Sequence, residues 1–220
     1  MPVPDPAEPI ALVLYEDPLS PWCALAERRI AEAAADLGVR VELRHAPYPL
    51  RAEPRLPSRR ERRRLARAAQ RASQAPGGHG LRPDLWLSDD PPLSSIPPLA
   101  ALAAARRQGR AHEAALRLAL REAALVRGLN VARLDVLYEL AERCGLDLER
   151  FAGAVAAPAT ERAVLAVWRT ARGRGIDSAP ALVIGEEWLV VGARRTEMYR
   201  SILRRFVSER LGMAPARTFH

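Results

Sequence analysis

The chain contains no lysine, so all 34 of its basic residues are arginine, and its formal net charge is +8. A strongly basic balance is typical of nucleic-acid-binding proteins, and the arginines are densest between Arg51 and Arg71. Exclusive use of arginine, however, indicates a compositional bias of the genome rather than selection for phosphate contacts. No aromatic residue lies within that stretch to stack on bases. We therefore expect a solvent-exposed helix face there and no nucleic-acid partner.

Cysteine is also scarce, with only Cys23 and Cys144. No basic residue precedes the first apolar run, Ile10 to Leu14, which is too short for a signal peptide. No stretch approaches the roughly 18 to 20 apolar residues of a membrane span. These absences predict a soluble, cytoplasmic protein with no membrane partner. Because the cytosol keeps thiols reduced, each cysteine is expected to be a separate thiol.

Aromatic residues make up only 5% of the chain, whereas hydrophobic residues make up 49% and are mainly alanine and leucine. This balance favours helix-rich packing over a β-sandwich. The histidines show no metal-ligand spacing, and neither cysteine has a ligand partner nearby, so no metal site is expected. The sequence also lacks a glycine-rich phosphate loop, so nucleotide binding is not indicated. The four histidines are His45, His79, His112 and His220.

The first 45 residues predict a β-α-β unit. Ile10–Tyr15 is apolar without alternation and reads as a buried strand. Ser20 is suited to cap the following helix, with Pro21 as its first residue and Gly38 just past its end. Val39–His45 alternates between apolar and polar residues, as in a second strand. A right-handed crossover would make the two strands parallel.

The middle of the chain predicts a block of helices separated at Pro76-Gly77-Gly78, Pro91-Pro92 and Pro97-Pro98. The expected helices are Ser58–Ser73, Leu99–Gln108, His112–Arg127, Val131–Cys144, Leu148–Val155 and Thr160–Arg172. Two short apolar runs then predict an antiparallel hairpin, followed by a terminal helix. These last elements are Ala181–Ile184, Trp188–Val191 and Thr196–Leu211. The whole order indicates an α/β fold.

Two motifs far apart in the sequence resemble the DsbA family of thioredoxin-like proteins. They are Ser20-Pro21-Trp22-Cys23 and Ser178-Ala179-Pro180. The segment from Asp17 to Cys23 is most similar to the FrnE-like dithiol oxidoreductases, which have Asp-Pro-x-Cys-Pro-Trp-Cys there, so that only the first cysteine differs. The resemblance implies a thioredoxin-like fold with a large all-helical insertion. It places the thioredoxin-like domain at residues 10–50 and 174–212, and the insertion at 51–173.

In this family the first cysteine is the nucleophile at the helix N-terminus, and here that position is Ser20. A two-thiol cycle within the motif is therefore excluded. The helix dipole alone would leave Cys23 roughly 5 to 15% ionised at pH 7, which makes it a modest nucleophile, and a weaker one if it is buried. The resemblance thus implies a thiol-disulfide oxidoreductase with an altered monothiol site, in which Cys23 and Ser20 are the catalytic residues.

The resemblance also implies how a substrate would bind. A cis bond would precede Pro180, which would face Ser20 and Cys23, while the backbone of Ala179 would pair with an extended ligand. Pro21 and Trp22 would complete the cleft. The expected partner is a thiol- or disulfide-bearing peptide or a glutathione-like molecule, with no bound cofactor other than glutathione as a possible cosubstrate.

Simpler interpretations stay open for these residues. Ser20 could only cap the helix by accepting from the Cys23 N–H, and Pro180 could be an ordinary trans proline. Cys144, at the end of a predicted helix, is expected to be a small buried apolar group.

Two other functions are compatible with the same architecture. Kappa-type glutathione transferases and 2-hydroxychromene-2-carboxylate isomerases carry Ser-Pro at the Ser20-Pro21 position, where the serine hydroxyl stabilises the glutathione thiolate. Those relatives have a Ser/Asn-Asp-Arg stretch after the last strand. This chain has Gly192-Ala193-Arg194-Arg195, in which either arginine could hold a carboxylate. The third possibility is a non-catalytic binding module. The sequence does not predict the oligomeric state.

Overall fold

A four-stranded sheet forms the centre of the protein in the computed structural model, which describes residues 9–210. The strands are β1 (Ile10–Glu16), β2 (Val41–Pro47), β3 (Ala181–Ile184) and β4 (Trp188–Val191), in the order β2-β1-β3-β4. β1 and β2 are parallel, while β3 runs antiparallel to both β1 and β4. The predicted β-α-β unit and hairpin are therefore confirmed.

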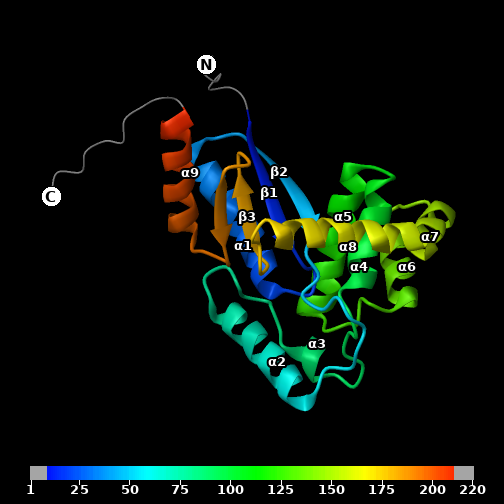
Figure 1. Cartoon of the computed structure of the whole chain (residues 1–220). Coiled ribbons are helices and arrows are strands. Elements are labelled where there is room, and N and C mark those ends of the chain that lie inside the picture. Colours follow the sequence, from blue (N-terminus) through cyan, green and yellow to red (C-terminus); the bar gives the residue numbers. More distant parts are fainter. Residues whose placement is uncertain (1–8, 211–220) are drawn as a thin grey trace.

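Helices α1 (Pro21–Leu37) and α9 (Thr196–Arg210) lie side by side on one face of this sheet (Figure 1). Alternate residues of β1 point to that face, where Leu12 and Leu14 pack with Ile30 of α1 and Leu203 of α9. Gly38 ends α1 in the left-handed conformation at φ 63°, as its position in the sequence predicts. This packing fixes the start of α1 at one end of the sheet.

Between β2 and β3 the chain forms a helical part with its own core. Its elements are α4 (Ile96–Arg106), α5 (Arg110–Arg121), the π-helix η1 (Glu122–Val126), α6 (Leu134–Arg143), α7 (Leu148–Ala156) and α8 (Pro158–Gly173). Leu116, Leu120, Leu137 and Phe151 are fully buried at its centre. α8 crosses in front of α4 and α5 and reaches back to the sheet (Figure 1). There its Ala171 packs with Tyr15 and Tyr48 on the face of the sheet opposite α1 and α9.

Helix α2 (Arg59–Gln74) runs along the edge of the molecule beside the short α3 (Asp84–Leu87) (Figure 1). Its buried positions are three alanines, Ala66, Ala69 and Ala72. The rest of its surface is polar and largely faces solvent. In the described part of the chain, no helix has both the length and the apolar character needed to cross a membrane.

Some predicted boundaries were wrong. Pro97 and Pro98 do not break a helix; they lie in the first turn of α4, which begins at Ile96. Proline is tolerated there because the first N–H groups of a helix have no intrahelical acceptor. α6 begins at Leu134 rather than Val131, and the four-residue α3 was not predicted. Residues 211 and 212, which end the predicted terminal helix and domain, lie outside the described residues.

Candidate functional site

The site predicted from the sequence begins in the turn that joins β1 to α1. The turn closes with a hydrogen bond from the Ser20 N–H to the Asp17 carbonyl at 3.0 Å. Ser20 is the N-cap of α1, and its hydroxyl accepts from the Cys23 N–H at 3.4 Å, while Pro21 follows as the first helical residue. The capping role of Ser20 is thus present. Only 6% of Ser20 is exposed.

Asp17 holds the turn from inside. Its carboxylate oxygens accept from the N–H groups of Leu19 at 2.9 Å and Leu50 at 2.8 Å, and its own N–H donates to the sulfur of Cys23 at 3.5 Å. Burial raises the pKa of the Asp17 carboxyl, although the two backbone donors oppose this effect. Leu19 packs into the core of the helical part, which ties the turn to both halves of the molecule.

The thiol of Cys23 is completely buried. Burial raises its pKa to about 12 because the thiolate would lose its hydration, and the negative charges of Glu16 and Asp17 act in the same direction. Desolvation therefore outweighs the helix dipole, and Cys23 is the weaker nucleophile that the sequence predicts for a buried thiol. In this structure Cys23 is a neutral, inaccessible group.

Pro180 lies at the same end of the sheet as the turn before α1. β3 begins at Ala181, which pairs with Tyr15 near the end of β1, and the Pro180 carbonyl accepts from the Gly192 N–H at 2.8 Å. The Ala179–Pro180 bond is cis. Ala179 is half-buried, and within residues 9–210 its N–H and carbonyl have no hydrogen-bond partner. A ligand site formed jointly by Ser20, Cys23 and Pro180 stays a prediction.

The other predicted residues have different settings. Trp22 is half-buried on α1. Cys144 belongs to the helical part, where it is half-buried against the core rather than fully buried as expected, and partial burial raises the pKa of its thiol.

A buried ionic network next to the turn was not predicted. The carboxylate of Glu16, the last residue of β1, forms an ion pair with Arg117 at 2.9 Å and a second one with Arg121. Both arginines belong to α5. Arg121 bridges to Glu27 of α1, which also contacts His45 at 3.2 Å. The only local sequence signal is a charged residue at the end of a buried strand. Its partners lie about a hundred residues further along the chain.

Part of this network has the composition of a metal site. Among the described residues, Glu16, Glu27 and His45 offer ligand atoms within 4.8 Å of one another. Both carboxylates, however, are already paired with the guanidinium of Arg121. Although burial opposes it, the hydrogen bond from His45 and the charge of Arg121 hold the pKa of Glu27 at about 2. This chemistry is that of a charge-neutralised network rather than an open cation site.

Comparison with known proteins places this geometry in a family. The model of the DSBA-like thioredoxin domain matches residues 11–204. The chain belongs to that family. Solved structures with a similar fold include, by name, oxidoreductases and an isomerase, and the thioredoxin-like fold inferred from the two motifs is confirmed.

Two solved structures and one curated relative illustrate the likeness. 2-Hydroxychromene-2-carboxylate isomerase has a TM-score of 0.65 at 19% identity, covering 93% of this chain and all of the other. The cytosolic disulfide reductase DsbM from Pseudomonas aeruginosa with GSH has a TM-score of 0.64 at 22% identity, covering 90% and 98%. At such identities the likeness concerns the fold alone.

The ClpXP adapter protein SpxH from Bacillus subtilis (strain 168) is 34% identical over 149 residues, 66% of this chain and 48% of that protein. The chain thus spans about half the length of the curated relatives it matches.

Proposed function

We propose that this DSBA-like protein binds the thiol of glutathione or a glutathione-like ligand at the start of α1 and acts as a glutathione-dependent isomerase or transferase. Ser20 would stabilise the ligand thiolate. The observation that carries this proposal is the state of Cys23, which is completely buried and has a pKa of about 12. This state counts against the monothiol oxidoreductase that the sequence favours.

Disulfide exchange requires a thiolate that can reach the sulfur of its substrate. Cys23 meets neither requirement, and Cys144 packs half-buried against the core of the helical part, far along the chain from the start of α1. A ligand that brings its own thiol needs no ionised cysteine in the protein. It needs hydrogen-bond donors and a favourable dipole, and the start of a helix supplies both.

Ser20 is suited to this role because its hydroxyl can donate to a thiolate while its oxygen accepts from the Cys23 N–H. The unpaired backbone groups of Ala179 could extend the contact by pairing with the peptide-like part of the ligand. Pro21, Trp22 and Pro180 would form the apolar surroundings. Arg194 and Arg195, both exposed after β4, could hold a ligand carboxylate.

Calorimetric titration with reduced glutathione tests the proposal in the wild type, Ser20→Ala and Cys23→Ala. We expect Ser20→Ala to weaken binding about tenfold, the size of one lost hydrogen bond to a charged group, and Cys23→Ala to leave it nearly unchanged. S-methylglutathione, which cannot form a thiolate, should bind the wild type as weakly as glutathione binds Ser20→Ala. Loss of binding in Cys23→Ala alone would support the monothiol oxidoreductase instead.

A second candidate is a non-catalytic binding module, favoured by the identity with SpxH, a ClpXP adapter by name. This function would use the fold as a protein-binding surface and would not need a ligand thiol. Immobilised protein exposed to purified ClpX tests it directly. Binding to ClpX together with no measurable affinity for glutathione would replace the first proposal with this one.

A further inference from the structure

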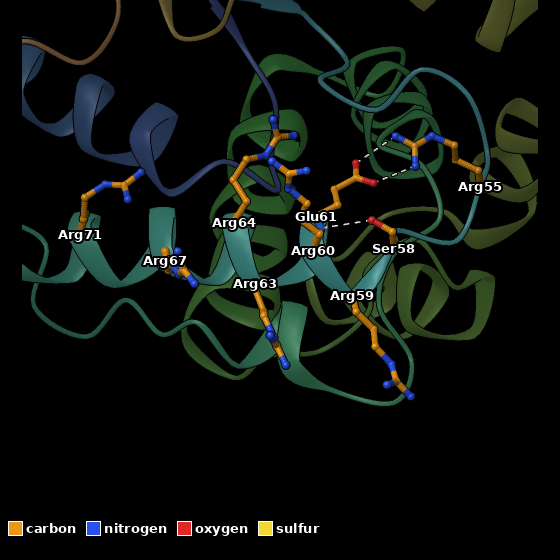
Figure 2. Close-up of a pocket in the computed structure, with 9 residues that line it drawn as sticks. All are labelled: Arg55, Ser58, Arg59, Arg60, Glu61, Arg63, Arg64, Arg67 and Arg71. Carbon is orange, nitrogen blue, oxygen red and sulfur yellow. Dashed lines mark hydrogen bonds and ion pairs between the residues drawn. The ribbon is translucent and has the colours of Figure 1, made fainter.

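Six arginines of α2 form a surface that the fold leaves without counter-charge. They are Arg59, Arg60, Arg63, Arg64, Arg67 and Arg71. All six are exposed, and within residues 9–210 none of them has an ion pair, side-chain hydrogen bond or ring contact. Figure 2 shows Arg59 and Arg63 extending to one side of the helix, and Arg60 and Arg64 to the other. We call these six side chains the arginine surface.

The spacing of these arginines concentrates positive charge. Arg59, Arg63, Arg67 and Arg71 follow one another at intervals of four residues, which places them along about 18 Å of helix. Like charges at this spacing repel one another and destabilise the helix. The acidic residue of α2, Glu61, is already paired with Arg51 at 2.5 Å. It is also paired with Arg55 at 2.7 Å (Figure 2). The repulsion is therefore relieved by nothing in the described part of the fold.

The arginine surface continues into an apolar area at the N-terminal end of α2. It borders a hollow of about 1080 Å³, and Arg55 and Glu61 line both this hollow and a neighbouring one of about 220 Å³ that includes Leu50. Leu50 is 49% exposed and Leu56, just before the helix, is 66% exposed. One surface thus presents free guanidinium groups beside exposed leucines.

We propose that the arginine surface binds an acidic polypeptide segment that carries apolar residues at one end. Guanidinium groups pair bidentately with carboxylates, and exposed leucines are buried by apolar side chains. A nucleic acid would leave the leucines uncovered, and no aromatic residue lines the hollow to stack on bases. The arginine surface shares no residue with the proposed thiol site, so this proposal does not depend on the proposed function.

Fluorescence anisotropy with a labelled peptide tests the proposal. The probe is a chain of about a dozen residues, glutamate-rich with leucines at one end, and a glutamine-for-glutamate version is its control. The variant Arg59→Gln/Arg63→Gln/Arg67→Gln is compared with Arg150→Gln/Arg162→Gln/Arg169→Gln. The latter removes the same charge from exposed arginines of α7 and α8 that have no side-chain partner among the described residues. Circular dichroism checks that both variants fold.

We expect the glutamate probe to bind at low salt and to be released as salt rises. The α2 variant should weaken binding about tenfold, the control variant less than about twofold, and Leu56→Gln about threefold. The proposal is overturned if the probe does not bind, if both triple variants weaken binding equally, or if a single-stranded or duplex oligonucleotide displaces the peptide and binds independently of Leu56.

Discussion

At the scale of single residues, the neutral thiol of Cys23 makes the fold sensitive to alkali. Its pKa rises from 9.0 to about 12 on burial, so the native state keeps the proton longer than the unfolded state. The stability this contributes is complete below pH 9 and is lost as pH rises toward 12. We expect the free energy of unfolding to fall with pH more steeply in the wild type than in Cys23→Ala, by up to about 1.4 kcal/mol per pH unit.

Urea unfolding of both proteins between about pH 8 and pH 11 measures this difference. All other titratable groups are common to both proteins, so their contributions cancel in the comparison. Parallel pH profiles would mean that the Cys23 thiol ionises in the native state, and they would restore the oxidoreductase interpretation.

Glu27 gives the opposite pH dependence. Its pKa is lowered from 4.5 to about 2, because His45 and Arg121 stabilise the carboxylate more than burial destabilises it. The stability it contributes is present above pH 4.5 and is lost as pH falls toward 2. Glu27→Gln should cost about 1 to 3 kcal/mol near neutral pH and lose less stability on acidification than the wild type. Acid titration of thermal unfolding tests this, and equal acid sensitivity would contradict it.

How much of the site could be predicted depended on the range of the interactions. The cap at Ser20 was predictable because it involves only the next three residues. The pKa of Cys23 was not, since it depends on how completely the folded chain buries the thiol. The same holds for Glu16, whose partners Arg117 and Arg121 come from α5. The local sequence pattern identifies where a helix starts. The charges and the burial around that helix start are determined only when distant segments fold together.

At the scale of elements, two glycines with positive φ allow two costs of an alanine substitution to be compared. At one position the cost is backbone strain alone, and at the other a steric collision is added. Gly38 ends α1 at φ 63° with no atom within 4 Å of an added Cβ, whereas Gly185 begins the β3–β4 turn at φ 57° and a Cβ there would collide with the ring of Phe206. Gly38→Ala should therefore cost about 1 kcal/mol. Gly185→Ala should cost about 1 to 3 kcal/mol more, because Phe206 of α9 is buried against the hairpin and cannot move freely.

Thermal unfolding of the two variants tests this comparison directly. Equal losses would mean that the Phe206 ring moves aside without cost. A Gly185→Ala, Phe206→Leu double variant gives a control, since the smaller side chain should recover part of the loss.

The elements themselves were largely predictable, because strands and helix caps leave local patterns. The exceptions have local causes. Pro97 and Pro98 indicated a break, although the first turn of α4 tolerates both. The π-helix η1 continues directly from α5, and its residues are as typical of an α-helix as those of α5. Its π-helical geometry therefore could not be predicted from residue type.

At the scale of the whole molecule, the sheet and the helical part are joined by buried charge. Arg121 of α5 neutralises Glu16 of β1 and Glu27 of α1, and its side chain is only 9% exposed. Arg121→Met should cost about 3 to 5 kcal/mol, because the buried carboxylate of Glu16 and the half-buried carboxylate of Glu27 each lose one of their partners. A matched control is Arg133→Gln, which removes an exposed arginine paired with Asp90 and Asp135 and should leave stability nearly unchanged.

A double-mutant cycle shows whether the loss arises from this pairing or from packing. In Glu16→Gln/Arg121→Met, Arg117 still has Glu113 at 2.7 Å and Glu27 still has His45 at 3.2 Å, so each remaining charge has a partner. The double variant should therefore be about 1 to 3 kcal/mol more stable than the sum of the single effects predicts. Additive losses in urea unfolding would show that Arg121 acts mainly through its apolar stem. The two parts of the molecule would then be held together by packing alone.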